Sequence, residues 1–184
     1  MLSSFLQKLM FVNQFSIAKG KIEILKDNYI MLNARSILVL QEIDQSKVYN
    51  AGKKSSEQDI HKLVKHAQVY KNIKNQELKN IATLSKKIGK TDEGTIKTLE
   101  TIFEIYGLGK LEIINLDNEN SKATLRIRNS TIALAQPKKT STPSCSLTAG
   151  ILAGIFSYIF DKDVDCIENK CIAKKDQSCE FLIK

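Results

Sequence analysis

The chain has few of the residues and motifs on which the common enzyme classes depend. Its 184 residues include only two histidines and two prolines, and they contain no glycine-rich phosphate loop and no dinucleotide fingerprint. No Ser-His-Asp or Cys-His pairing with a local signature occurs, and no pair of carboxylates is placed for acid–base work. We therefore assign no catalytic residue and favour a role other than catalysis, while leaving an enzymatic activity open.

Long hydrophobic runs are also missing. The longest apolar stretch, from Leu147 to Phe160, has 14 residues, whereas a membrane-spanning helix needs about 20. The N-terminus lacks the basic leader of a signal peptide. We expect a cytoplasmic protein with no membrane span, whose cysteines stay reduced and are available to a metal.

The net charge of +8 suggests an acidic partner at first sight. The basic residues are densest between Lys53 and Lys97, where acidic residues are interleaved with them. Such a pattern is typical of a solvated helical face, so we expect no nucleic-acid binding. Binding that weakened steeply with salt would indicate the opposite.

Hydrophobic periodicity predicts an α+β fold in a single domain, residues 1–184. Helices are expected at 3–11, 34–49, 56–89, 92–106 and 145–160, with a polar break at 52–56. Strands are expected at 21–25, 29–32, 111–116, 123–128, 164–168 and 179–183. Small residues around Gly150 and Gly154 predict that the last helix closely approaches another backbone, either the sheet or, less favoured, a second copy of the chain.

All four cysteines lie in the last forty residues, and three of them bracket an acidic side chain. Cys145, Cys171 and Cys179 supply thiolates, which bind zinc readily, and a tetrahedral site needs one further donor. Glu168 and Cys166 are both candidates, since they share one face of an extended strand. A metal-free cluster of core cysteines is the less favoured alternative.

The pattern of the tail resembles the 4-vinyl reductase domain. The resemblance rests on the run from Cys145 to Gly154, on Val164 to Glu168, on Cys171-Ile172-Ala173 and on Asp176 to Phe181, with 22, two and seven residues between Cys145, Glu168, Cys171 and Cys179. It is firmest over residues 108–184 and weaker over the helical and hairpin lead-in, 1–107. It implies the fold of subunits of the TRAPP trafficking complex, an antiparallel sheet with helices packed against it, usually as a homodimer.

The resemblance also implies a ligand set. In phenol-sensing transcriptional activators with this domain, three cysteines and a glutamate hold zinc, and the matching residues here are Cys145, Glu168, Cys171 and Cys179. Cys166 is then a buried thiol. Because four protein ligands leave no position for water, the resemblance implies a structural zinc.

The function implied is binding of a small apolar or aromatic ligand, as a sensor or a carrier. Candidate pocket residues, which can equally be close-packed core, are Phe103, Tyr106, Leu147, Ile151, Ile155, Phe156 and Tyr158. Two alternatives stay open. One is an enzyme or accessory factor of tetrapyrrole vinyl reduction, and the other is an interaction scaffold like the trafficking-complex subunits.

Overall fold

A computed structural model describes residues 15–18, 20–24, 27–69, 99–100, 102–104 and 106–184. The chain divides into two compact units, Met1–Asn33 and Ala34–Lys184.

The first unit contains a small antiparallel sheet. Its strands are β1 (Phe15–Ala18), β2 (Lys21–Ile24) and β3 (Asp27–Tyr29), in the order β1-β2-β3. The predicted hairpin is confirmed, although β3 already begins at Asp27, which pairs with Ile24. Strand β1 was not predicted, and the expected helix 3–11 lies outside the described residues.

The second unit is built on a four-stranded antiparallel sheet of order β4-β5-β7-β6. Its strands are β4 (Lys110–Asp117), β5 (Lys122–Arg128), β6 (Cys166–Lys170) and β7 (Cys179–Ile183). The predicted hairpin and final strand are confirmed, and the strand expected at 164–168 begins two residues later. These strands form because apolar and polar residues alternate along them, as β5 and β7 show in their burial.

The two faces of this sheet differ in chemistry. The outer face carries a row of alternating charges, with Arg126 paired in register with Glu112 on one side and Glu180 on the other. Lys170 extends the row, since its Nζ lies 3.2 Å from Glu180. The inner face is apolar and buried, and it includes Leu111, Leu125, Ile127, Phe181 and Ile183.

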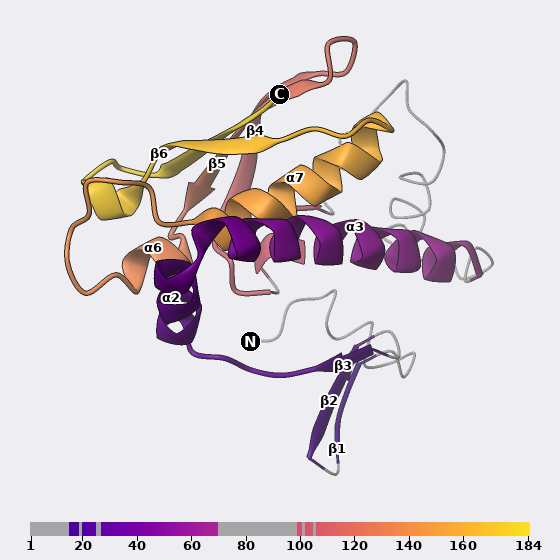
Figure 1. Ribbon diagram of the computed structural model, residues 1–184. Coiled ribbons are helices and arrows are strands. Elements are labelled where there is room, and N and C mark those ends of the chain that lie inside the picture. Colours follow the sequence, from indigo (N-terminus) through magenta and orange to yellow (C-terminus); the bar gives the residue numbers. More distant parts are fainter. Residues whose placement is uncertain (1–14, 19, 25–26, 70–98, 101, 105) are drawn as a thin grey trace. The chain divides into compact units, whose positions relative to one another are not determined.

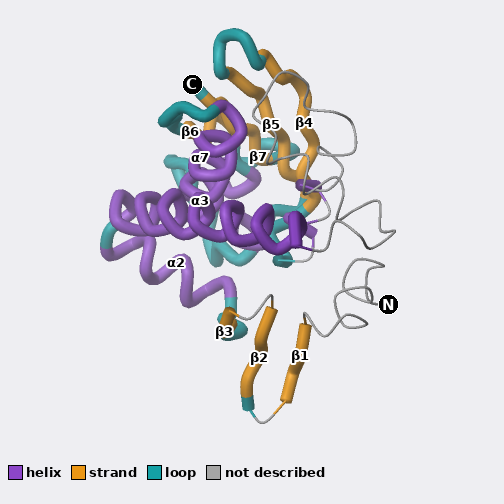
Figure 2. Tube along the Cα trace, turned by 90° about the vertical axis from the view of Figure 1, so that its right-hand side faces the viewer, coloured by secondary structure: helices purple, strands orange, loops and turns teal. Residues whose placement is uncertain are grey.

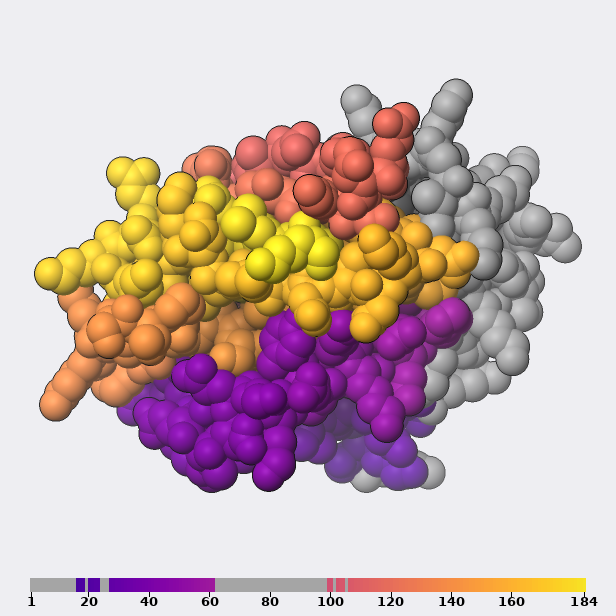
Figure 3. Space-filling model, turned by 45° about the horizontal axis from the view of Figure 1, so that its top comes forward, coloured from indigo at the N-terminus to yellow at the C-terminus, as the bar shows by residue number. Residues whose placement is uncertain are grey.

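Helices cover the inner face. The helix α7 (Ser146–Phe160) lies between the sheet and the long helix α3 (Gln45–Val69), as Figures 1 and 2 show from two sides. The helix α2 (Ala34–Ile43) contacts α3, α7 and the short helix α6 (Thr131–Leu134). In Figure 3 the purple surface of α3 lies directly against the orange and yellow surface of the C-terminal elements. Among the described helices, none is long and apolar enough to cross a bilayer.

The small-residue stripe of α7 packs against a helix, and the expectation of packing on the sheet was wrong. A side-chain carbon at Gly150 would collide with the carbonyl of Tyr49, and one at Gly154 with the carbonyl of Lys53. Gly52 faces the same contact from α3. The predicted break at 52–56 was also wrong, since α3 continues through it. Polar composition indicated a loop there, but the close contact with α7 keeps the backbone helical.

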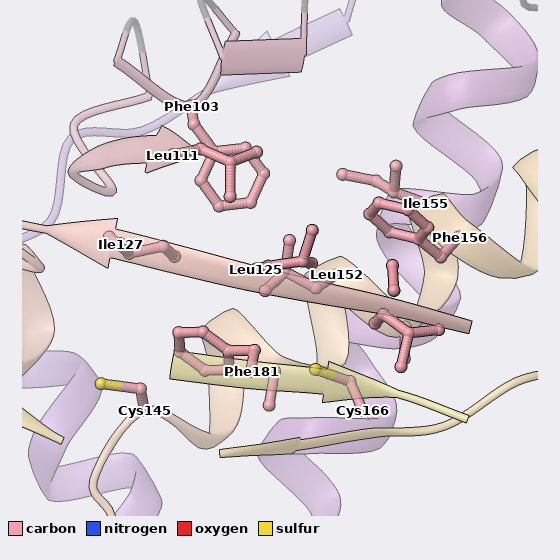
Figure 4. Close-up of a cluster of buried hydrophobic side chains, with 14 of the residues drawn as sticks. Phe103, Leu111, Leu125, Ile127, Cys145, Leu152, Ile155, Phe156, Cys166 and Phe181 are labelled. Atoms are coloured by element: carbon pink, nitrogen blue, oxygen red, sulfur yellow. The ribbon is translucent and has the colours of Figure 1, made fainter. Parts of the chain in front are cut away.

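Large apolar side chains fill the space between the sheet and α7. Figure 4 shows this core, in which Leu125, Ile127 and Phe181 of the sheet face Leu152 and Phe156 of α7. Residues 99, 100 and 102–104 are helical, in agreement with the helix expected at 92–106, of which the rest is largely outside the described residues.

Candidate functional site

Four side chains meet at one end of the sheet, and they are the four that the sequence nominated. The ligand atoms of Cys145, Glu168, Cys171 and Cys179 all lie within 4.8 Å of one another. The sulfur of Cys179 is 3.8 Å from that of Cys145 and 3.9 Å from that of Cys171. A tetrahedral zinc ion with Zn–S bonds of about 2.3 Å separates its sulfurs by about 3.8 Å. The cluster therefore has the donors and the size to bind a metal ion.

Each ligand comes from a different part of the C-terminal fold. Cys145 is the residue before the first turn of α7, and Glu168 lies on β6. Cys171 directly precedes the 3-10 turn η1 (Ile172–Lys174), and Cys179 is the first residue of β7. A bound ion would therefore fasten the start of α7 to two neighbouring strands and to the turn between them.

The carboxylate of Glu168 is held ready to donate one oxygen. Its Oε2 accepts a hydrogen bond from the backbone N–H of Cys145, with a distance of 2.9 Å. Its Oε1 is buried and has no hydrogen-bond partner among the described residues. A buried carboxylate oxygen without a partner is costly, and a metal ion in the cluster would satisfy it.

Polar groups surround the sulfurs. The hydroxyls of Ser130 and Ser144, both buried, lie 3.5 Å from the sulfurs of Cys145 and Cys171 respectively. The N–H of Ile172 points at the sulfur of Cys179 at 3.5 Å. Hydrogen bonds of this kind stabilise thiolates and orient the ligands of a metal site. The sequence gave no distinctive signal for these two serines, apart from the position of Ser144 next to a ligand.

The charges of the cluster favour a bound cation. Hydrogen bonds from Cys145 and Cys179 hold the pKa of Cys171 far below its usual range. The same hydrogen bonding, now with Cys171 and Cys179, raises the pKa of Cys145 strongly. Burial raises the pKa of Glu168 to about 7. Without a cation the cluster thus stabilises one thiolate and resists further negative charge, whereas a divalent ion compensates that charge.

Cys166 lies outside this cluster. It is buried in the apolar core, and burial raises the pKa of its thiol. In Figure 4 the side chains of Cys145 and Cys166 lie on either side of Phe181. Cys166 pairs with Ile183 across the sheet, two positions along the strand from Glu168, which pairs with Phe181. The two residues share a face, but only Glu168 reaches the start of α7.

Gln41 of α2 braces the segment that delivers Cys145. Its amide nitrogen donates to the carbonyl of Ser144 at 2.6 Å, and its amide oxygen accepts from the N–H of Leu147 at 3.0 Å. The side chain is buried, with 3% of its surface exposed. Sequence reasoning missed this residue, since 103 positions separate it from Ser144.

Replacing Gln41 with leucine is expected to lower the free energy of unfolding by about 2 kcal/mol or more, because it leaves two buried backbone groups without partners. The measurement is urea unfolding of both proteins. Gln45→Leu is the matched control, because Gln45 is exposed at the start of α3. Equal effects at the two positions would contradict the bracing role.

An apolar pocket of about 170 Å³ lies between α3, α7 and the segment from Leu99 to Leu108. Its lining is Ser55, Ser56, Asp59, Ile60, Leu99, Ile102, Phe103, Tyr106, Leu108, Ile151 and Ile155. The hydroxyl of Ser56 hydrogen bonds to the carbonyls of Lys53 and Ile151, so it already has partners within the protein.

Four of the seven side chains nominated for a pocket line this one, namely Phe103, Tyr106, Ile151 and Ile155. The other three lie elsewhere. Phe156 packs in the core against Phe160, Tyr158 stacks edge-on with His61, and Leu147 packs against α3 at Gly52. They were included because α7 is apolar all round, so its sequence does not distinguish the pocket side from the core side.

The first lysine of the basic region is engaged within the protein. The Nζ of Lys53 lies 2.7 Å from Asp163 and 2.9 Å from Asp165. The region beyond residue 69 lies largely outside the described residues, and the absence of nucleic-acid binding stays a prediction.

Comparisons with known proteins identify the C-terminal region. Residues 124–184 match the model of the 4-vinyl reductase domain family. An uncharacterized protein of Methanocaldococcus jannaschii is 29% identical over 86 residues, which are 47% of this chain and 50% of that protein. The chain thus spans about half the length of this curated relative.

Three solved structures share the fold. The phenol-responsive sensory domain of the transcription activator PoxR, with phenol, has a TM-score of 0.61 at 15% identity and covers 100% of this chain and 91% of its own. A vinyl-4-reductase family protein of Methanocaldococcus jannaschii has a TM-score of 0.52 at 20% identity, covering 100% and 96%. Subunit 3 of the trafficking protein particle complex of Naegleria fowleri, covalently bound to palmitic acid, has a TM-score of 0.54 at 10% identity, covering 82% and 89%. The expected fold, an antiparallel sheet with packed helices as in 4-vinyl reductase domains and TRAPP subunits, is confirmed.

Proposed function

We propose that this chain, whose residues 124–184 carry a 4-vinyl reductase domain, binds a small apolar or aromatic molecule as a sensor or carrier and is held together by a structural zinc ion. The observation that carries the proposal is the apolar pocket beside α7, the helix whose first turn starts at the metal cluster.

The donor set supports zinc as the metal. Three thiolates and one carboxylate suit zinc better than the hard cations magnesium and calcium, which prefer oxygen ligands. With four protein ligands, the ion would act as a cross-link between α7 and the strands β6 and β7. Cys145, Glu168, Cys171 and Cys179 would hold it.

The size and lining of the pocket support a ligand with one ring. A cavity of about 150 Å³ lined by leucine, isoleucine and phenylalanine is large enough for benzene, and the pocket here has about 170 Å³ with the same kinds of side chain. As bounded by the described residues, that volume is small for a tetrapyrrole, which favours the sensor or carrier over the vinyl-reductase alternative.

The structural neighbours support the same ligand class. The PoxR domain carries phenol, and the trafficking-complex subunit carries palmitic acid. Both are molecules with a large apolar part, held by proteins of this fold. A purely scaffolding role is the weaker alternative, since it assigns nothing to the pocket.

The proposal predicts that phenol and toluene bind and that filling the pocket prevents it. Ile155→Trp should weaken binding by about tenfold or more, because burial of an apolar ring contributes about 1.5–3 kcal/mol. Tyr158→Phe, on a side chain outside the pocket, is the control and should bind as wild type does. Ligand-observed NMR titrations provide the measurement.

Two further results decide between the alternatives. Native mass spectrometry of protein purified from its own cells should detect a bound small molecule, and an empty protein that also ignores phenol and toluene would refute the proposal. Addition of a porphyrin should leave the absorbance of the porphyrin unchanged. A clear spectral shift would favour the tetrapyrrole alternative instead.

A further inference from the structure

The helix α2 presents two faces of opposite environment. Leu38 and Gln41 are buried against the rest of the unit. Val39, Leu40 and Ile43 lie on the other face, with 55%, 49% and 76% of their surfaces exposed. A helix of ten residues with three large exposed aliphatic side chains is unusual for a surface that meets only water.

This exposed face is a fixed platform. The two hydrogen bonds of Gln41 fasten α2 to the start of α7, and α2 also contacts α3 and α6. The neighbouring helix α6 adds Leu134, with 59% of its surface exposed. Rigid apolar surface supports association because little conformational entropy is lost when a partner binds.

The charges at the ends of the face indicate what the partner is. Arg35 lies one turn before Val39, and Glu42 lies three residues after it, so both are on the exposed side of α2. If two copies of α2 pack antiparallel, Arg35 of one copy meets Glu42 of the other, and this happens twice. The apolar residues then meet in the centre. A surface that complements itself in this way fits a two-fold contact.

We propose that this face of α2 is the homodimer interface, with the two helices antiparallel and Val39 near the two-fold axis. The partner is a second copy of the chain. The packed centre consists of Val39, Leu40 and Ile43, and the two Arg35–Glu42 pairs fix the antiparallel direction. The inference is independent of the pocket, because none of these side chains lines it.

Charge reversal tests the interface in the full-length chain. Sedimentation equilibrium measures the dissociation constant of the dimer. Arg35→Glu places two acidic groups opposite each other at each end, and Glu42→Arg places two basic groups there. Each should raise the dissociation constant about tenfold or more. The double variant Arg35→Glu/Glu42→Arg restores opposite charges and should return the constant to within about threefold of wild type.

A second pair of variants tests the centre. Val39→Asp brings two carboxylates together at the axis and should give a monomer, whereas Ile114→Asp changes an exposed aliphatic residue on β4 and should leave the dimer intact. Metal content and phenol binding, measured on the same samples, report folding and ligand binding separately.

Three results would overturn the inference. One is a wild-type protein that is monomeric at all concentrations, as expected if the segment before residue 34 or another protein covers the face. Another is a dimer that tolerates both single charge reversals. The third is a double variant that dissociates as readily as the single ones, since the pairs then do not face each other.

Discussion

Replacing Cys179 with serine is expected to abolish metal binding and to lower the free energy of unfolding by about 4 kcal/mol or more. Cys179 contacts two of the other ligand sulfurs and has none of its surface exposed, so its loss leaves the cluster incomplete and its centre hollow. A serine hydroxyl is a poor substitute, since zinc prefers thiolate sulfur. Metal analysis of the purified protein and urea unfolding provide the measurements.

A panel of single variants makes this prediction specific to the four ligands. Wild type should contain one zinc ion per chain. Cys145→Ser and Glu168→Gln should lose the metal as Cys179→Ser does, whereas Cys166→Ser is the matched control and should retain it. Loss of metal from Cys166→Ser, with retention in Glu168→Gln, would reassign the fourth ligand.

The sequence was sufficient to predict those parts of the fold that depend on local pattern. Strands β5 and β7 alternate strictly between apolar and polar residues, and α7 is a continuous apolar run that begins next to a cysteine. The four ligands were found because their types and spacing match a known pattern. Burial and backbone periodicity alone left Glu168 and Cys166 equivalent.

What separates those two residues is position along the strand. They share a face of β6, and the pairing with β7 decides which of them lies beneath the start of α7. Register depends on the whole sheet, so no local signal contains it. The same limit applies to Gln41, whose partners are more than a hundred residues away in the chain.

The predicted break at 52–56 failed for a different physical reason. A glycine followed by two lysines and two serines is polar and turn-like, which indicates a loop. In the fold, Gly52 is needed where α3 crosses α7, and Ser56 donates to the carbonyl of Ile151 on α7. Contacts between helices thus overrode the local preference, and the same contacts lead to the second large effect.

Replacing Gly150 with alanine is expected to lower the free energy of unfolding by about 2–3 kcal/mol. The added methyl group would collide with the carbonyl of Tyr49, which is backbone and cannot turn aside. Inside an isolated helix the same change stabilises by about 1 kcal/mol, because alanine is a far better helix former than glycine. The sign of the effect therefore shows directly whether α3 and α7 are in close contact.

The three glycines of this crossing should rank by the space around them. Gly154→Ala should be as harmful as Gly150→Ala, since its methyl group would collide with the carbonyl of Lys53. Gly52→Ala should cost less, because the nearest atom there, the carbonyl oxygen of Leu147, is 2.8 Å from the added carbon. Urea unfolding of the three variants measures the order. Stabilisation by Gly150→Ala would mean that the two helices lie farther apart, and the wall of the pocket formed by Ser56 and Ile151 would then lose its support.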